Sequence, residues 1–256
     1  LQYARHLAPG PEGRLVISDM GRLVEYDGDG GFLRTVPLDF SSRVTSGPEG
    51  TWIAQKVDQE FRADKQTMTW SVSLLDTGYS NPRKLDFLSA EISTSSFPLP
   101  EPLLCWSASN DRAFVADEGR GYEIRVYDAA GTLRRRIKKD YEPVSVSDEY
   151  KANALKQLPE PLRKAVQFPL VHTPFQALAA SDDGRLFVAT FEPGDQPGAF
   201  LFDIFDRDGV LTGRVSLRAF IWEGHLWMKI ASGMIYSLTE KPNGFKEIVV
   251  SRIRWD

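Results

Sequence analysis

Six oxygen-bearing side chains near the ends of predicted β-strands are the residues of this chain best suited to bind a metal ion. They are Asp19, Asn110, Asp117, Glu118, Asp182 and Asp183. Carboxylate and amide oxygens are the ligands that Ca²⁺ takes in proteins. The competing interpretation is structural, because Asp and Asn at strand ends also form turns by bonding to nearby backbone. The sequence favours turns and leaves calcium as an alternative.

Other catalytic chemistries find little support in the residue types. The chain has three histidines and one cysteine, and no two of them have the spacing of a zinc site. Cys105 lies in an apolar run, which predicts an inert buried thiol rather than a nucleophile. No Gly-x-Ser-x-Gly motif is present, and the GDGG run at 28–31 fits a hairpin turn better than a phosphate-binding loop. We therefore expect no catalytic residue and no bound cofactor. Only the alternative interpretation of the six oxygen-bearing side chains adds a bound Ca²⁺.

The densest positive charge is the run RRRIKK at 134–139. A nucleic-acid or anionic-lipid patch would use such a run. The run follows Gly131, however, and so falls on the predicted outermost strand of a sheet, where Lys and Arg protect an exposed edge. The net charge of the chain is −4, which disfavours general affinity for nucleic acid. We expect edge protection and no nucleic-acid partner.

One short phrase recurs along the chain and indicates how these residues are positioned. It occurs as VEYDGDGGFL at 24–33, IRVYDAAGTL at 124–133 and FDIFDRDGVL at 202–211. In each copy an aromatic residue and an Asp precede a Gly, and the Asp and Gly are three residues apart. Asp bonds nearby backbone and Gly supplies positive φ, so the phrase predicts a tight turn between two strands. The aromatic residue before the Asp is expected to pack against the next unit.

A second phrase, a turn followed by an apolar strand, precedes the first. Its five copies lie at 12–17, 49–54, 110–115, 183–188 and 223–228. Together the phrases define units of four strands, which in the fourth unit are predicted at about 175–180, 185–190, 200–205 and 210–217. Four antiparallel strands repeated at roughly 40 residues or more are typical of a β-propeller. A β-sandwich is the alternative, but it needs no internal similarity of this kind.

Two of the five units depart from the pattern. In the second unit, the turn after Asp76 continues as TGYSNPRKL without the standard spacing. The segment around 58–66 of the same unit is charged, and we expect it to be a long connection between strands. The fifth unit is compact and has almost no room for a separate first strand.

The largest insertion covers residues 140–172. Ser147 followed by acidic residues predicts a capped amphipathic helix that Pro159 stops. A second short helix is predicted at about 161–167. An insertion between propeller strands lies on one rim, so we expect it to contact a protein partner. The expected partner-binding residues are Tyr141, Tyr150, Leu155, Leu158 and Phe168.

The length and composition fit one all-β domain over residues 1–256. Hydrophobic residues make up 42% of the chain, which is ordinary for a globular protein. No apolar run approaches the roughly 18 residues needed to cross a bilayer. The chain begins at Leu1 without a signal-like segment, so we expect a mature or trimmed product. Membrane attachment, if any, would come through a missing N-terminal anchor.

Three segments of the chain resemble a known group of β-propeller proteins. DRAFVADEGRGYEIRVYDAAGTL at 111–133 is similar to NHL-type and TolB-like six-bladed β-propellers. RRIKKDYEPVSVSDEY at 135–150 and FPLVHTPFQALAASDDGRLFVAT at 168–190 resemble an exported bacterial subgroup of them. The resemblance covers nearly the whole chain and implies a periplasmic or extracellular protein, in some members lipid-anchored. It implies six blades where the sequence shows five, which favours a six-bladed ring incomplete at the N-terminus over a five-bladed one.

Three functions are compatible with these features. The first is a non-catalytic binding or scaffold module of the bacterial cell envelope, which recognises a protein or other ligand through rim loops. The second comes from the resemblance, because some six-bladed propellers are lactonases or esterases with Ca²⁺ in the central channel. The third is carbohydrate binding through Trp222 and Trp227, although Trp227 fits the core pattern of an inner strand. We favour the first.

Overall fold

The computed structural model describes residues 6–10, 13–19, 21–38, 43–62, 65–93, 95–222, 225–241 and 244–255. Five antiparallel sheets follow one another along the chain, and within each the strands lie in chain order. We call them blades 1 to 5. Blade 1 contains β1 (His6–Pro9), β2 (Leu15–Asp19), β3 (Arg22–Tyr26) and β4 (Phe32–Pro37), and blade 2 contains β5 (Arg43–Ser46), β6 (Trp52–Arg62), β7 (Lys65–Leu75) and β8 (Arg83–Ser93). Blade 3 contains β10 (Leu104–Ala108), β11 (Ala113–Asp117), β12 (Glu123–Tyr127) and β13 (Leu133–Lys138), blade 4 contains β15 (Ala177–Ala180), β16 (Leu186–Pro193), β17 (Ala199–Phe205) and β18 (Leu211–Arg218), and blade 5 contains β21 (Met228–Ala231), β22 (Met234–Glu240) and β23 (Lys246–Arg252).

The remaining elements are short. Two pairs of two-residue strands are β9 (Phe97–Pro98) with β14 (Val166–Gln167), and β19 (Ile221–Trp222) with β20 (His225–Leu226). The helices are α1 (Asp148–Lys156) and α2 (Glu160–Arg163), and single 3-10 turns occur at η2 (Pro48–Gly50) and η3 (Glu118–Arg120). None of the described helices is long and apolar enough to cross a bilayer.

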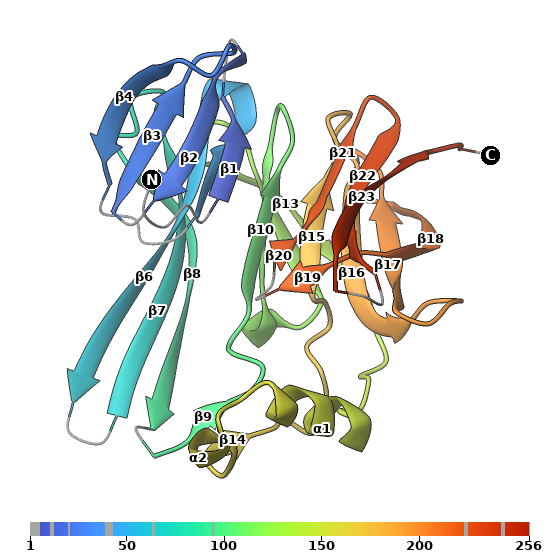
Figure 1. Ribbon diagram of the computed structural model, residues 1–256. Coiled ribbons are helices and arrows are strands. Elements are labelled where there is room, and N and C mark those ends of the chain that lie inside the picture. Colours follow the sequence, from blue (N-terminus) through green and yellow to red (C-terminus); the bar gives the residue numbers. More distant parts are fainter. Residues whose placement is uncertain are drawn as a thin grey trace.

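Successive blades stand side by side in an arc rather than in two stacked layers (Figure 1). The innermost strands of neighbouring blades contact each other, β1 with β5, β10 with β15, and β15 with β21. Blades 2 and 3 meet through β7, β8, β10 and β11. Each blade is a four-stranded or three-stranded meander that buries its faces against its neighbours, which is the architecture of a β-propeller. The predicted fold class is confirmed, and a β-sandwich is excluded.

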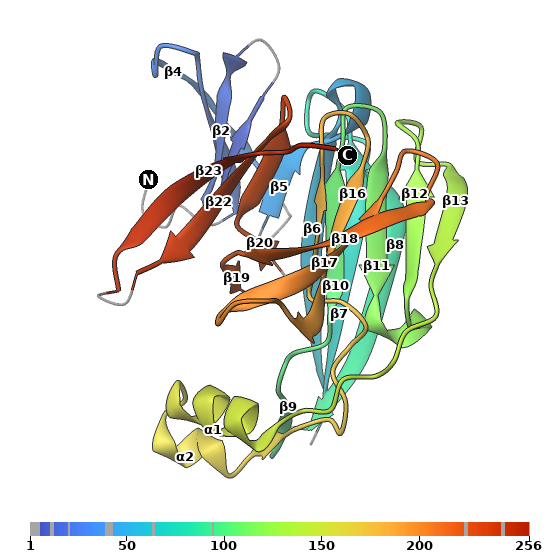
Figure 2. The same ribbon diagram turned by 90° about the vertical axis from the view of Figure 1, so that its right-hand side faces the viewer.

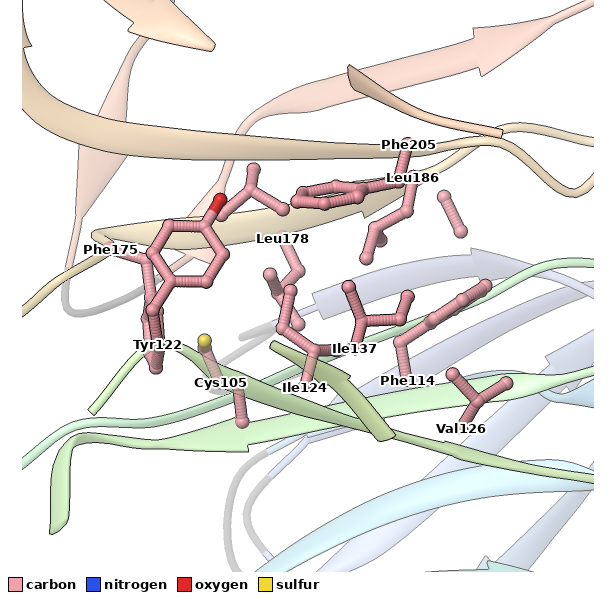
Figure 3. Close-up of a cluster of buried hydrophobic side chains, with 13 residues drawn as sticks. Cys105, Phe114, Tyr122, Ile124, Val126, Ile137, Phe175, Leu178, Leu186 and Phe205 are labelled. Carbon is pink, nitrogen blue, oxygen red and sulfur yellow. The ribbon is translucent and has the colours of Figure 1, made fainter. Parts of the chain in front are cut away.

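The core lies between the blades, as the seam of blades 3 and 4 illustrates (Figure 3). Phe114 and Ile124 of blade 3 face Leu186 and Phe205 of blade 4, and all four side chains are buried. Burying a side chain of this size stabilises a fold by roughly 1.5–3 kcal/mol. Cys105 belongs to the same cluster, and its burial raises the pKa of the thiol. The prediction that Cys105 is buried is confirmed.

The recurring Asp and Gly build the turns as predicted. Carboxylate Oδ1 of Asp206 accepts the backbone N–H groups of Asp208 and Val210, both at 2.9 Å. Gly209 adopts φ +74°, and a β-carbon there would lie 2.9 Å from Ile137 of the preceding blade. The same turn recurs after β3 and β12, where Gly30 and Gly131 have φ of +84° and +76°.

In blades 3 and 4 the aromatic residue before the turn packs against the preceding blade rather than the next. Tyr127 of blade 3 is buried in the cluster shared with blade 2, and Phe205 of blade 4 lies in the cluster shared with blade 3. The expectation that these rings contact the following unit is therefore wrong. Side chains alternate between the two faces of a twisted strand, and the ring at the end of the third strand lies on the face that meets the preceding blade.

Blade 2 corrects the predicted connection around 58–66. Instead of a loop, β6 and β7 continue as a ladder as far as the pair Arg62 and Lys65. One ion pair of the segment crosses between strands, since Lys65 Nζ lies 2.8 Å from Glu91 Oε2 on β8, and Arg62 pairs with Glu60 within β6. Cross-strand pairs of opposite charge stabilise an exposed ladder, so charge here marks solvent-facing strand rather than loop.

Among the described residues blade 5 has three strands, and β21 takes the innermost position because it contacts β15 of blade 4. The expectation that the fifth unit has almost no room for a separate first strand is therefore wrong. The phrase at 223–228 does not form its second strand, because His225–Leu226 pairs with Ile221–Trp222 in a separate hairpin. Trp227 follows that hairpin and is 47% exposed, so it does not occupy the core position that the sequence suggested. The side chain of Trp222 lies outside the described residues.

Two blade faces are left uncovered by any described strand. On blade 1, Leu7 and Phe32 are 57% and 63% exposed, and on blade 5, Ile248 and Val250 are 71% and 51% exposed. These faces belong to the sheets at the two ends of the arc (Figure 1). Tyr26, the blade 1 counterpart of Tyr127 and Phe205, is only partly buried and contacts Phe32. The apolar pattern of an internal seam therefore continues onto both end blades.

The basic run lies where it was predicted. β13 is the outermost strand of blade 3. Two of its cations pair with acids of the same blade, since Arg134 Nε lies 2.6 Å from Asp128 Oδ2 and Lys138 Nζ lies 3.0 Å from Glu123 Oε2. Arg135 instead lies 3.5 Å from Asp208 of blade 4. Ile137 alone turns inward and is 4% exposed. The run thus combines a core residue with a charged edge.

Candidate functional site

The insertion between β13 and β15 is the most distinctive feature of one rim. Both ribbon views show its helices at one end of the molecule, apart from the five sheets (Figures 1 and 2). Ser147 caps α1 by accepting the Tyr150 N–H at 3.1 Å, as predicted. Pro159 ends the first helix and precedes α2. The second helix ends at Arg163, earlier than predicted, because the chain then enters the short strand β14.

Two extended limbs fasten the insertion to the blades. The limbs bond to each other, since the N–H of Val146 donates to the carbonyl of Leu170 at 3.1 Å and that of His172 to Val144 at 2.8 Å. β14 also pairs in parallel with β9, which lies in the linker between blades 2 and 3. The insertion is consequently anchored at both sides of blade 3.

His172 joins helix α1 to blade 4. Its ring stacks on Phe191 of β16 with a centroid distance of 4.0 Å and an interplanar angle of 11°. Tyr150 of α1 meets the same imidazole edge-on at 4.7 Å. Burial lowers the pKa of His172, so the neutral ring is favoured in this aromatic stack.

The structure places the predicted partner-binding residues in two groups. Tyr141 lies on the first limb and is 38% exposed. Tyr150, Leu155 and Leu158 lie in α1 or just after it, and Phe168 directly follows β14. All four are partly buried. Neither helix contains a fully buried residue. Leu162 and Leu170, which the sequence analysis did not single out, are 46% and 91% exposed.

A small recess of about 10 Å³, room for about one water molecule, lies at the base of the insertion, where its limbs meet blades 3 and 4. Tyr122, Tyr141 and Phe191 provide aromatic lining, and Lys139, Glu142 and Glu192 provide charged lining. These residues come from the start of β12, the limb after β13, and β16. The recess therefore belongs both to the rigid blades and to the insertion.

Asp203 organises the charges beneath the recess. Its carboxylate is fully buried and accepts Tyr122 Oη at 2.6 Å, Lys139 Nζ at 2.7 Å and Arg214 Nε at 2.8 Å. Arg214 forms a second ion pair with Glu192. Burial, together with the negative charge of Asp203, raises the pKa of the Tyr122 hydroxyl. A buried carboxylate with two cations and a hydroxyl donor is well satisfied.

Three of the candidate metal ligands are engaged with arginines. Asp19 Oδ2 lies 2.8 Å from Arg22, and Asp117 and Asp183 form ion pairs with the arginines that follow them in sequence. Among the described residues, no three His, Cys, Asp or Glu side chains are grouped as a metal ion would require.

The other three candidates bond to backbone. The side chain of Asn110 donates to the Asp182 carbonyl at 3.2 Å, and Asp182 Oδ2 accepts the Ser232 N–H at 2.8 Å. Glu118 Oε2 accepts the Leu103 N–H at 3.2 Å. The six residues thus serve different turns and strand ends, which is the structural interpretation of their positions.

No motif in the sequence indicates the recess. One signal was available: Asp203 interrupts the apolar strand AFLFDIF, and a lone acid within a buried strand needs partners. The partners themselves, Tyr122, Lys139 and Arg214, are far from one another in the sequence and carry no common motif.

Fold and site together define a β-propeller with a helical insertion on one rim. No protein family model and no curated protein matches the chain. Solved structures similar to it include BBS1N in complex with ARL6DN, at 11% identity over 97% of this chain and 60% of that chain, with a TM-score of 0.36. The Neurospora crassa Pan2 WD40 domain is similar at 11% identity over 97% of this chain and 61% of that chain, with a TM-score of 0.37. A gluconolactonase from Xanthomonas campestris is similar at 11% identity, covering 92% of this chain and 82% of that chain, with a TM-score of 0.36.

The match to this chain covers only 60% and 61% of the length of the first two of these proteins, about three fifths. At such TM-scores the similarities carry no argument about activity. The assignment of a β-propeller rests on the sheet order and the contacts between blades described above.

Proposed function

We propose that this β-propeller is a non-catalytic binding module that contacts a protein partner through its helical insertion. The observation that carries the proposal is that the insertion presents apolar side chains although it is firmly anchored. Leu162 and Leu170 are 46% and 91% exposed, while the limbs that carry the helices are hydrogen-bonded and stacked on blade 4. Exposed apolar surface on an ordered segment is typical of an interaction site.

The insertion contributes little to the propeller core, which supports a role in binding. Neither α1 nor α2 buries a residue completely, and the clusters between the blades contain no residue of either helix. A segment that stabilises the fold would be expected to bury apolar side chains. Because the anchored limbs hold the helices in place, a partner would meet a largely preorganised surface.

Removal of the helices tests the proposal. Residues 147–169 are replaced by a two-residue turn, because Val146 and Leu170 already face each other across a backbone hydrogen bond. The full chain and this variant are used as bait in extract of the source organism. A protein retained by the full chain is then purified, and its Kd for both baits is measured.

The expected result is that the variant loses the partner while its Tm falls by less than about 3 °C. The pair L162S and L170S should weaken binding of the purified partner roughly tenfold or more, as loss of two exposed anchors would. V210S, which trims an apolar residue of intermediate exposure in the β17–β18 turn (58%, between the values for Leu162 and Leu170), is the matched control. Unchanged affinity of the variant without the helices would show that the partner binds elsewhere.

We also propose the bacterial cell envelope as the compartment of this binding, on the basis of the resemblance alone. Fractionation of the source organism, followed by immunodetection of the chain, tests it. Recovery in the cytosolic fraction would contradict this assignment without affecting the binding proposal.

A further inference from the structure

Blade 5 stops at its third strand, at the edge where the other blades add a fourth. Blades 1 to 4 each have an outermost fourth strand, whereas among the described residues blade 5 ends at β23. The third strands of blades 3 and 4 are largely buried, but β23 is exposed along nearly its whole length. We propose that an extended segment of another protein, apolar at its centre and acidic at both ends, adds to β23 as the fourth strand of blade 5.

The backbone of β23 offers hydrogen-bonding groups to such a segment. Directly after β23, the N–H of Ile253 donates to the carbonyl of Gly233 at 2.8 Å. The ladder between β22 and β23 has no register shift, so the odd-numbered residues of β23 bond to β22 and the even-numbered ones turn outward. Ile248 and Val250 therefore direct their N–H and C=O groups to the open edge, where an incoming strand can pair with them.

The side chains at the centre of β23 favour pairing. Ile248, Val249 and Val250 are 71%, 38% and 51% exposed, and no charge interrupts residues 248–251. β-Branched side chains fit a β-sheet well. The outermost strand of blade 3, by contrast, has Arg135 and Arg136 at its centre, as strands that remain at an edge commonly do.

The charges at the two ends of β23 indicate which segment fits. Lys246 and Arg252 are both exposed, and in the part of the chain that the structure describes neither forms an ion pair. The acid of the strand, Glu247, is paired with Lys241. Opposite charges that face each other across two strands are stabilising. A segment with an acid opposite each of the two cations therefore complements β23.

A second copy of this chain fits the edge less well. If the β23 strands of two copies paired antiparallel about Val249, Lys246 of each would stand opposite Arg252 of the other, and like charges in that position are destabilising. The outermost strand of blade 1, β4, carries Arg34 and ends at Pro37, which has no N–H to donate. Both ribbon views also place β23 apart from the helices of the insertion, so this edge is a separate site (Figures 1 and 2).

A short peptide tests the proposal in the full chain. The probe is the acetylated and amidated heptapeptide Glu-Thr-Val-Thr-Val-Thr-Glu, whose palindromic sequence suits either strand direction. It is added to the isotope-labelled chain at a chain concentration too low for self-association, and amide exchange is followed by NMR. We expect a Kd on the order of 0.1–1 mM. At ten times that concentration the amides of Ile248 and Val250 should exchange about tenfold more slowly.

Two altered peptides separate strand addition from other binding. Methylation of the two valine nitrogens removes the donors that would face β23, and it should abolish the protection. Replacement of both glutamates by lysine should weaken binding at least about fivefold, because like charges then meet at both ends of the strand.

Substitutions in the chain provide the second arm. V250P removes an outward N–H and leaves the bonds to β22 in place, so it should weaken the probe at least about fivefold; V250T keeps the N–H and is its control. R252E should weaken the probe and strengthen the lysine-ended peptide. K164E, which reverses an exposed cation next to α2, is the matched control.

Protection of Ile248 and Val250 before peptide is added would overturn the proposal, because the chain itself or a second copy would then fill the edge. Equal binding of the methylated or lysine-ended peptide, no protection at about 5 mM probe, or indifference to both V250P and R252E would overturn it as well. The proposed function fails or holds separately. The variant that lacks 147–169 keeps blade 5, so it should lose the partner of the insertion and still bind the probe.

Discussion

Tyr79 shows how one side chain can replace the conformational freedom of glycine. It occupies the turn after β7 at the place where the other blades have a glycine, and its φ is +62°. Asp76 fills the usual role of the turn, since its Oδ1 accepts the N–H groups of Gly78 and Ser80 at 3.0 and 2.9 Å. The left-handed backbone of a tyrosine is unfavourable by roughly 1–2 kcal/mol, so the side chain must compensate.

The compensation comes from the seam with blade 1. The ring of Tyr79 packs on Trp52 with a centroid distance of 4.9 Å, and its hydroxyl donates to Glu25. Burial and the bond to Glu25 both raise the pKa of the phenol. The aberrant spacing in the sequence therefore marks a turn that connects two blades as well as two strands.

Substitution of Tyr79 tests this account. Y79G relieves the backbone but removes the ring, and we expect a net loss of about 2–3 kcal/mol in the free energy of unfolding. Y79F keeps the ring, and it should cost about 1–2 kcal/mol because Glu25 loses a donor. Urea unfolding of both variants provides the measurement. If Y79G is as stable as the parent protein, the contacts of the ring do no more than offset the strain of the left-handed backbone at this position.

At the scale of elements, His172 makes the attachment of α1 sensitive to pH. Its pKa is lowered by burial from the usual value of 6.5, so the unfolded insertion binds a proton more readily than the folded one. The stability that His172 contributes is complete above about pH 6.5 and is lost as the pH falls through the lowered folded pKa. The aromatic contacts with Phe191 and Tyr150 are then made by a charged, poorly solvated ring.

Hydrogen exchange measures the effect directly. After correction for intrinsic rates, amides of α1 should exchange faster at pH 5 than at pH 7.5, whereas amides of β16 and β17 should keep their protection. H172F retains the stack without the titrating group and should abolish the difference. Equal protection of α1 at both pH values in the parent protein would contradict the proposed role of His172.

Elements that depend on a few consecutive residues could be predicted from the sequence, whereas elements that depend on contacts between distant residues could not. The turns at Asp27, Asp128 and Asp206 depend on four or five consecutive residues, and they form as expected. The ladder at 58–66 depends on Glu91 and its neighbours across the sheet, which local charge could not reveal. The recess depends on Tyr122, Lys139 and Asp203 meeting across a blade seam, and only the packing of the blades brings them together.

At the scale of the whole molecule, the two uncovered blade faces should govern how the chain behaves in solution. Leu7, Leu15 and Phe32 of blade 1 and Tyr236, Ile248 and Val250 of blade 5 present apolar surface of the kind that the internal seams bury. Exposed apolar side chains grouped on one face favour association in water. Where no further blade covers them, they would pair with whatever complementary surface is available.

Sedimentation of the 256-residue chain tests this inference. We expect concentration-dependent association that F32K combined with I248K suppresses, because a charge on each open face disfavours its burial. V210K, on an exposed turn of blade 4, is the control and should leave the association unchanged. A chain that stays monomeric at every concentration would show that these faces do not drive self-association.

The parallel pair β9–β14 has a mechanical consequence. It lies at the same end of the molecule as the helices (Figure 1) and connects the linker before blade 3 with the insertion that follows this blade. A force applied to the helices is therefore divided between two linkers instead of being concentrated at one hinge. Blade 3 is clamped from both flanks, so under tension we expect it to be the last blade to detach from the arc.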